Sequence, residues 1–174
     1  MPERSRMTRV ERDLEATLRV ARWADTHGEP VCPRCYDGED VYDDPSCPAA
    51  APPLHTYHCR CCRYRFTALT RSALHHCKLD LWQLAQVVLV GPPPPAQITR
   101  ELGRRTGVDY LAIRRMAQRL TAEEPLLMRW RERMAEAGLT IEKIERAHHA
   151  ENAGWALLAR RRAENARSYQ RRRL

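Results

Sequence analysis

The sequence predicts a mainly α-helical protein that carries one small β-sheet. Apolar residues recur at three- and four-residue steps over most of the 174 residues, which is typical of amphipathic helices packed on a core. Residues 31–78 differ, with short runs of β-forming residues and two Cys-x-x-Cys turns. The hydrophobic fraction of 43% is inflated by alanine, so we expect small modules rather than one large core.

The first helix is predicted over residues 7–24, and Gly28-Glu29-Pro30 ends it. Its charges nearly cancel, so we expect a solvated polar face and an apolar face that packs against the cysteine-containing segment. Residues 1–12 lack the apolar core of a signal peptide, and no run approaches the ~20 apolar residues of a membrane span. We therefore expect a soluble, cytoplasmic protein. The apolar positions of this helix are Val10, Leu14, Leu18, Ala21 and Trp23.

The two Cys-x-x-Cys turns predict a metal site. Zn²⁺ prefers four tetrahedral ligands, and each such turn directs two thiolates at one ion. Disulfides or simple burial are the alternatives, but the chain has an odd number of cysteines, seven, and nothing else indicates an oxidising compartment. One structural Zn²⁺ is therefore expected, closed to catalysis, with the ligands Cys32, Cys35, Cys59 and Cys62.

The other cysteines and the histidines leave alternatives open. Cys61 allows a Cys-x-Cys pairing with Cys59 in place of Cys62, and Cys47 is interpreted as a spare loop thiol. Four thiolates already satisfy the ion, so the nearby histidines are expected at the surface or near DNA: His55, His58, His75 and His76.

Short strands are predicted around the turns, at residues 41–42, 56–58 and 64–67. A small antiparallel sheet that carries two Cys-x-x-Cys turns is a zinc ribbon. The connection over residues 36–58 is acidic and would repel phosphate, so it is expected to face away from DNA or to contact a basic protein surface.

A buried helix is predicted over residues 79–90, with Asp80 as its N-cap. Gly91 and the four prolines that follow end it, and the proline run is interpreted as a stiff spacer. The face of this helix expected to be buried comprises Leu81, Leu84, Ala85, Val88 and Leu89.

A helix-turn-helix is predicted next, with a helix over residues 96–102, a turn over 103–108 and a second helix over 109–120 capped by Asp109. Arg and Gln on such a second helix can contact base edges or phosphates in a major groove. An ordinary two-helix unit with a solvated basic face is the alternative. The buried side is expected to comprise Leu111, Ile113, Met116, Ala117 and Leu120. The expected DNA-contacting residues are Arg104, Arg105, Tyr110, Arg114, Arg115, Gln118 and Arg119.

Two further helices are predicted at the C-terminal end, over residues 124–136 and from Thr140 onward, with Gly138 between them. The last helix has a partial heptad pattern, but His148 and Glu151 occupy the seam, so a coiled-coil dimer is a minor alternative. Its basic end is expected to be disordered or a frayed helix in solution and to bind phosphate backbones without reading sequence. The arginines concerned are Arg160, Arg161, Arg162, Arg171, Arg172 and Arg173.

The formal net charge of +8 comes almost wholly from arginine and favours a polyanionic partner, here double-stranded DNA. A genome rich in G and C would give the same arginine enrichment. By composition and pattern we divide the chain into an N-terminal helix (1–30), a zinc ribbon (31–78), a helical, helix-turn-helix region (79–122) and C-terminal helices with a basic tail (123–174).

Residues 20–120 together resemble the N-terminal region of zinc-ribbon insertion-sequence transposases. The resemblance rests on Arg22-Trp23, residues 28–35, 57–67 and 70–82, and in the helical part on residues 98–103, 109–116 and Arg119. It implies that the helix-turn-helix holds a DNA end. In that family a ribonuclease-H-like domain follows, whose Asp, Asp and Glu residues hold two Mg²⁺ for strand transfer.

After Leu120 this chain contains no aspartate, so that carboxylate cluster cannot be built from it. We therefore expect a non-catalytic DNA-binding protein, acting as a regulator or as a subunit of a nucleoprotein complex. The alternative is a zinc-ribbon adaptor that binds a larger protein machine such as RNA polymerase or a recombinase.

Overall fold

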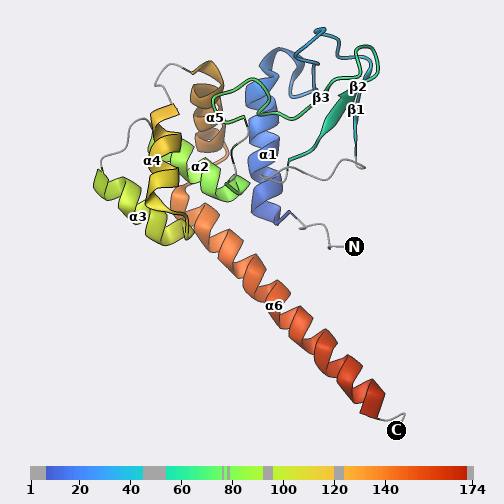
Figure 1. The fold of residues 1–174 in the computed structure, drawn as a ribbon, viewed down its shortest axis with the longest axis vertical. Coiled ribbons are helices and arrows are strands. Elements are labelled where there is room, and N and C mark those ends of the chain that lie inside the picture. The colour runs from blue at the N-terminus through green and yellow to red at the C-terminus, as the bar shows by residue number, and fades with distance from the viewer. Residues whose placement is uncertain are drawn as a thin grey trace.

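The computed structural model describes residues 7–44, 54–75, 77, 79–91, 96–119 and 124–171. Within these ranges the protein is mainly α-helical, with six α-helices and a three-stranded antiparallel sheet that carries a cysteine cluster, which confirms the predicted fold class (Figure 1). The elements are α1 (Arg9–Arg22), the 3₁₀ turn η1 (Ala24–Thr26), β1 (Val41–Asp43), β2 (Tyr57–Cys59), β3 (Arg65–Phe66), α2 (Leu81–Val90), α3 (Ala96–Thr106), α4 (Tyr110–Arg119), α5 (Pro125–Glu136) and α6 (Ile141–Arg171).

Helix α1 begins at a capping box, in which Thr8 Oγ1 accepts from the Glu11 N–H and the Glu11 carboxylate accepts from the Thr8 N–H. All five of its predicted apolar positions are buried. The helix packs mainly against α5, and next against α2 and α6, rather than against the sheet as expected. The C-terminal end of α1 meets the sheet, because Trp23 lies edge-on to the rings of Tyr57 and Phe66.

Helix α5 is fixed to its neighbours by three hydrogen bonds from consecutive side chains. The Arg129 guanidinium donates to the Ala21 carbonyl at 2.9 Å, and Arg131 donates to the Val88 carbonyl at 3.0 Å. Trp130, between them, is fully buried and its indole N–H donates to Thr17. The two arginines thus meet the C-terminal turns of α1 and α2, where a positive charge is favourable.

Helix α2 is buried on most sides, as a helix that is apolar nearly all round requires. It begins at the predicted cap Asp80, whose N–H donates to the Gln83 side chain at 2.9 Å, and it ends at Gly91 with φ +86°. Its ring contact with α6 is close, since Trp82 stacks on His148 with ring centroids 4.1 Å apart.

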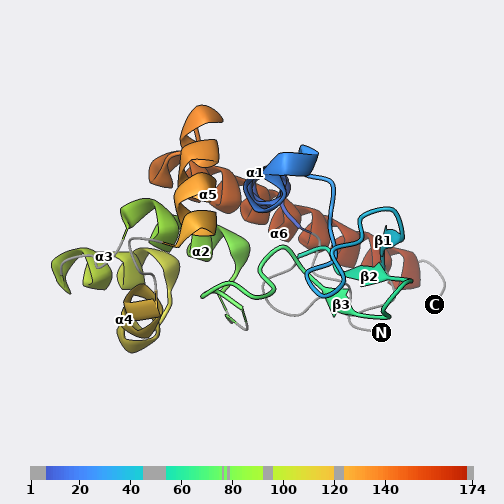
Figure 2. The same ribbon diagram turned by 90° about the horizontal axis from the view of Figure 1, so that it is seen from above.

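The arrangement separates the sheet from the α3–α4 pair. In both views they lie on opposite sides of the body formed by α1, α2 and α5 (Figures 1 and 2). Helix α6 starts beneath α2 and then extends away from the body. The first turns of α6 join the core, and Ile144 is fully buried there. The first apolar residues of its heptad pattern therefore pack against this chain's own core rather than being free for a partner helix.

Candidate functional site

Four cysteines meet at one point of the sheet. The four Sγ atoms all lie within 4.8 Å of one another; the residues are Cys32, Cys35, Cys59 and Cys62. The pairs Cys32–Cys62 and Cys35–Cys59 are both 3.5 Å apart, close to the sulfur–sulfur distance of about 3.8 Å that a tetrahedral zinc–thiolate centre requires. The donor set fits one Zn²⁺ with all four positions filled by protein, as predicted.

The two Cys-x-x-Cys turns share one backbone geometry. In the first, the Cys32 N–H donates to the Asp37 carbonyl, and the Cys32 carbonyl accepts from the Tyr36 N–H. In the second, the Cys59 N–H donates to the Tyr64 carbonyl, and the Cys59 carbonyl accepts from the Arg63 N–H. The residue after each turn, Tyr36 or Arg63, has a left-handed φ of 61° or 59°. This repeat places the two thiol pairs face to face.

The protonation of the cluster depends on these turns. Burial raises the pKa of Cys32. Hydrogen bonds from the N–H groups of Cys35 and Arg34 and from the neighbouring thiols have the larger, opposite effect, so the pKa is lowered to about 7. At Cys35 the Asp37 N–H lowers the pKa, but burial and the other three thiols raise it above its usual range. Burial is also the largest cause of the raised pKa of Cys62. A bound Zn²⁺ would take the place of the thiol protons, because the thiolate is the form that binds metal.

The other described cysteines, Cys61 and Cys77, lie outside this cluster. Cys61 is exposed, so the alternative pairing of Cys59 with Cys61 is not the one that the structure shows. Cys77 is buried, with its sulfur 3.9 Å from that of Met116, and Cys47 lies outside the described residues. Sequence reasoning missed Asp37, which forms a second potential metal-binding group with Cys35 and Cys61.

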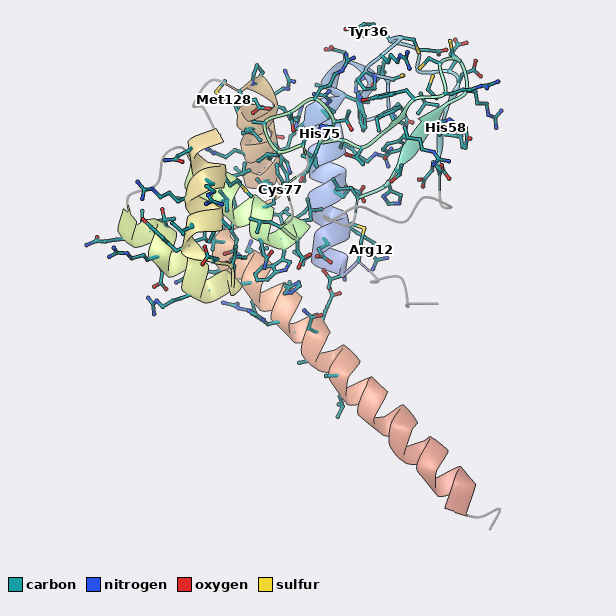
Figure 3. All side chains as sticks on the ribbon, viewed as in Figure 1. Arg12, Tyr36, His58, His75, Cys77 and Met128 are labelled. Carbon is teal, nitrogen blue, oxygen red and sulfur yellow. The ribbon has the colours of Figure 1, made fainter. Side chains whose placement is uncertain are left out.

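Of the histidines named above, the three that the structure describes are not part of the four-cysteine cluster. His55 contacts Glu15 of α1, with both its backbone N–H and its Nδ1 2.6 Å from the carboxylate, and it therefore joins the sheet to α1. His58 Nδ1 lies 2.5 Å from the Tyr42 hydroxyl on the outer side of the sheet (Figure 3). His75 lies between the sheet and α2, and His76 is outside the described residues.

A second candidate surface is formed by α3 and α4. The predicted boundary at Gly103 is wrong, because α3 continues to Thr106, so that Arg104 and Arg105 are helical and the turn contains only Gly107, Val108 and Asp109. Gly107 adopts φ +70°, and Asp109 Oδ1 accepts from the Leu111 N–H, the predicted N-cap. The two helices pack on each other and are joined by this three-residue turn, which contains a glycine.

The outward side of α4 is polar and basic. Ile113 is fully buried and Met116 partly so, as predicted, but Leu111 is 51% exposed rather than buried, because it is on the opposite side of the helix from Ile113. Tyr110 is partly buried under Arg100, whose guanidinium lies 5.8 Å from the ring centroid. Arg114, Arg115 and Gln118 are exposed, whereas nothing is described of the Arg119 side chain.

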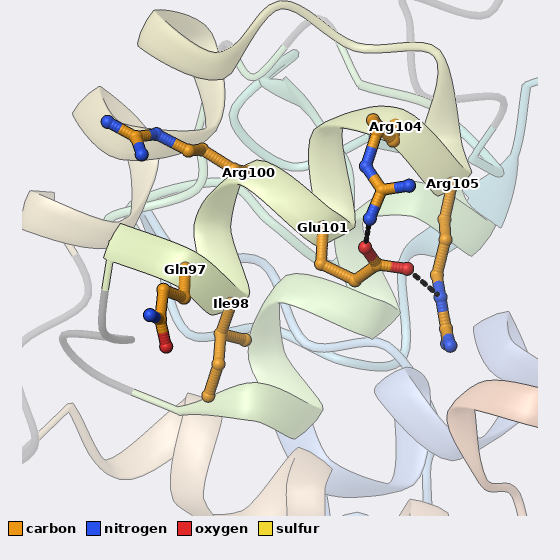
Figure 4. Close-up of a pocket in the computed structure, with 6 residues that line it drawn as sticks. All are labelled: Gln97, Ile98, Arg100, Glu101, Arg104 and Arg105. Atoms are coloured by element: carbon orange, nitrogen blue, oxygen red, sulfur yellow. Dashed lines mark hydrogen bonds and ion pairs between the residues drawn. The ribbon is translucent and has the colours of Figure 1, made fainter.

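Two of the predicted DNA-contacting arginines are held by a carboxylate. Glu101 pairs with Arg104 and also accepts from Arg105 at 3.0 Å, along the open side of α3 (Figure 4). Arg105 also approaches Glu145 of α6 at 3.8 Å. Glu101 was missed by sequence reasoning, although its spacing of three and four residues from the two arginines is the signal for such pairs.

The basic end of the chain continues α6. The helix extends through Arg171 rather than ending in a frayed segment. The side chains of Arg160, Arg161, Arg162 and Arg171, and all of Arg172 and Arg173, lie outside what the structure describes.

Comparison with protein families, with curated proteins and with solved structures gave no match for this chain. The class is therefore defined by the fold and the site: a helical protein with a small antiparallel sheet whose four cysteines can hold one metal ion, consistent with a zinc ribbon. Among the described residues no helix is long and apolar enough to span a membrane.

Proposed function

We propose that this chain is a non-catalytic, zinc-dependent protein that binds double-stranded DNA, similar to a transposase end-binding region, and acts as a regulator or as a subunit of a nucleoprotein complex. The observation that carries the proposal is the α3–α4 pair, with its three-residue glycine turn and the exposed Arg114, Arg115 and Gln118 on the second helix. Side chains of these types read guanine and adenine edges. The net charge of +8 supports a polyanionic partner.

Zinc has a structural part in this proposal. The site has four protein ligands and no open position for a substrate, so the ion would stabilise the sheet and the packing of Trp23 on it. The resemblance to transposases supports a DNA end as the target.

The proposal is tested by selecting sequences bound by the zinc-loaded protein from a random duplex pool, and then comparing the affinities of variants. Arg114→Ala and Arg115→Ala should each reduce the preference for the selected sequence, with a cost of about 1–3 kcal/mol where the arginine contacts a base. Arg12→Ala is the matched control, since Arg12 is an exposed arginine of α1 that lies away from α4 (Figure 3). Equal effects of all three substitutions, or no affinity for duplex DNA, would reject the proposal.

A second candidate is an adaptor that binds a larger protein machine through the zinc ribbon. Tyr36, 79% exposed, lies in the loop before β1, away from α3 and α4 (Figure 3), and the exposed acidic residues Glu39 and Asp40 follow it in the sequence. An exposed aromatic ring with acidic neighbours suits a basic protein surface. Copurification with a large assembly that is lost with Tyr36→Ser, together with no affinity for duplex DNA, would favour this candidate.

A further inference from the structure

We propose that Cys35, Asp37 and Cys61 form a second, open site for a thiophilic divalent cation such as Zn²⁺ or Cd²⁺. This site would adjoin the four-cysteine site and share the Cys35 thiolate with it. The proposal concerns metal binding alone and does not depend on whether the chain binds DNA.

The geometry of the three side chains supports this site. One ligand atom from each of Cys35, Asp37 and Cys61 lies within 4.8 Å of the other two, the same limit within which the four cysteines of the closed site meet. Cys61 is exposed and the other two side chains are partly exposed, whereas Cys32 and Cys59 of the closed site are fully buried. A cation can therefore reach the second site from solvent without opening the first.

The backbone explains why these side chains converge. Cys61 is the third residue of its turn, in the position that Arg34 occupies in the first turn, and this position faces outward in both. Asp37 is the second residue after the first turn, and its Oδ1 accepts from the N–H groups of Glu39 and Asp40 at 2.9 and 3.4 Å. These bonds hold the carboxylate beside Cys35, so little rearrangement is needed for it to act as a ligand.

The charge of the surroundings favours a second cation. A divalent ion bound by four thiolates leaves a net charge of about −2, and a metal-bound thiolate keeps lone pairs with which it can bridge to another ion. Asp37, Glu39 and Asp40 add three negative charges within four residues, which Arg34, Arg60 and Arg63 in and beside the two turns balance in number, so the excess negative charge is that of the thiolate centre. Arg60, the residue directly before Cys61, has its guanidinium over the Tyr42 ring, 4.9 Å from the ring centroid.

The chemistry of the two sites would differ. The first uses four thiolates and is closed, but the second has three protein ligands, two sulfurs and one carboxylate oxygen, and leaves a position for water or another donor. Three-ligand sites exchange their metal more readily. The second ion should therefore bind after the first and be removed before it.

The test is a titration of the full-length, reduced, metal-free protein with Cd²⁺ as the probe. Ions per chain are counted by native mass spectrometry, and thiolate-to-cadmium absorption is followed in parallel. The wild-type chain should take up a second ion after the first, and EDTA should remove the second ion first. Cys61→Ser and Asp37→Asn should each abolish uptake of the second ion and leave the first, with unchanged circular dichroism.

Cys77→Ser and Cys47→Ser are the matched controls, since each removes a thiol that is not one of the three proposed ligands, and both should retain the second ion. Saturation of the wild-type chain by a single ion would overturn the proposal. So would a second ion that persists in Cys61→Ser, or one that disappears in Cys47→Ser. Loss of both ions in Cys61→Ser would also contradict it, because it would place Cys61 in the first site.

Discussion

At the scale of single residues, the backbone after each Cys-x-x-Cys turn explains how the thiols meet. Tyr36 and Arg63 adopt left-handed φ values, which cost L-residues about 1–2 kcal/mol relative to helical or extended backbone. The four thiolates and the bound ion would compensate for this strain. The turn geometry follows from the backbone hydrogen bonds of Cys32 and Cys59, and neither residue after the turn is a glycine that would have indicated it in the sequence.

Tyr36→Gly is therefore expected to stabilise the zinc-loaded protein. Glycine adopts this φ without strain, and Tyr36 is 79% exposed, so the substitution removes little packing. We expect the free energy of unfolding to rise by about 1 kcal/mol, measured by chemical denaturation at saturating zinc. Arg34→Gly, in the same turn but without a positive φ, should lower it; a lower value for Tyr36→Gly as well would contradict this explanation.

His148 predicts a pH dependence of stability. Burial is the main cause of its lowered pKa, opposed by Glu11 of α1, Asp80 at the start of α2 and Glu151 of α6, and assisted by His149. As the pH falls below the ordinary value of 6.5, the unfolded chain takes up a proton on this imidazole before the folded chain does. The unfolded state then binds more protons, so the free energy of unfolding should fall with falling pH.

The measurement is chemical denaturation at several pH values from about 7.5 to about 5.5, a range that spans the ordinary histidine pKa. His148→Phe, which keeps a ring against Trp82, should show a smaller fall than the wild type. His27→Asn is the control, because His27 is exposed and its left-handed φ of 53° suits asparagine, and it should leave the slope unchanged. An unchanged slope in His148→Phe would show that the pH dependence arises elsewhere.

At the scale of elements, local signals predicted the caps and the metal ligands well, because each depends on residues close in the sequence. Asp80, Asp109 and Gly138 act at helix ends as predicted. Gly103 was predicted to end a helix, but it lies inside α3. A glycine is favoured there because a Cβ would lie only 3.1 Å from the Val108 carbonyl oxygen, a contact with the following turn that the helix signals do not reveal. The packing of α1 on α5 joins residues more than 100 positions apart, and periodicity alone carries no signal for such a pairing.

Glu101 is expected to weaken DNA binding by the α3–α4 pair. It neutralises Arg104 and Arg105, both of which are predicted to contact DNA. Because exposed ion pairs contribute less than about 1 kcal/mol, Glu101→Gln should tighten duplex binding by about three-fold and increase its salt dependence. Fluorescence anisotropy at several salt concentrations measures this, with Glu136→Gln, which frees Arg133 on α5, as the matched control. Equal gains in both variants would indicate a general charge effect.

Helix α6 gives a second prediction at this scale. Gly154 is exposed in the helix interior, and a Cβ added to it would meet nothing within 4 Å. Because alanine favours a helix over glycine by about 1 kcal/mol, Gly154→Ala should increase helical content measured by circular dichroism and delay its loss on heating. Gly107→Ala is the contrasting variant: its left-handed φ of +70° should make the substitution destabilising. A helical content unchanged in Gly154→Ala would mean that α6 is already fully helical in solution.

At the scale of the whole molecule, the two candidate surfaces lie apart. The sheet and the basic α3–α4 pair are on opposite sides of the helical body (Figures 1 and 2), and α6 extends away from that body toward the bottom of Figure 1. Because of this separation, the sheet with its metal site could contact a partner protein while α3 and α4 contact a polyanion. It also makes the contributions of the parts to DNA binding separable by variants, since charges at distant sites add nearly independently.

The last part of the chain should contribute affinity without selectivity. Residues 160–174 contain seven arginines and a single glutamate, and such a segment neutralises phosphates whatever the base sequence. A chain ending at Ala159 should bind selected and random duplexes more weakly by the same factor. Its slope of log affinity against log salt should also become less steep, by about 0.9 for each phosphate that the shortened chain no longer neutralises.

Arg114→Ala should act in the opposite sense, reducing the difference between the two duplexes more than the salt slope, because a base contact discriminates sequence whereas a phosphate contact does not. Measured together by anisotropy, the truncation and the substitution thus assign discrimination to α4 and general attraction to the basic end of α6. If truncation reduces binding to the selected duplex alone, or if the salt slope is unchanged by it, the end of α6 has no such general role.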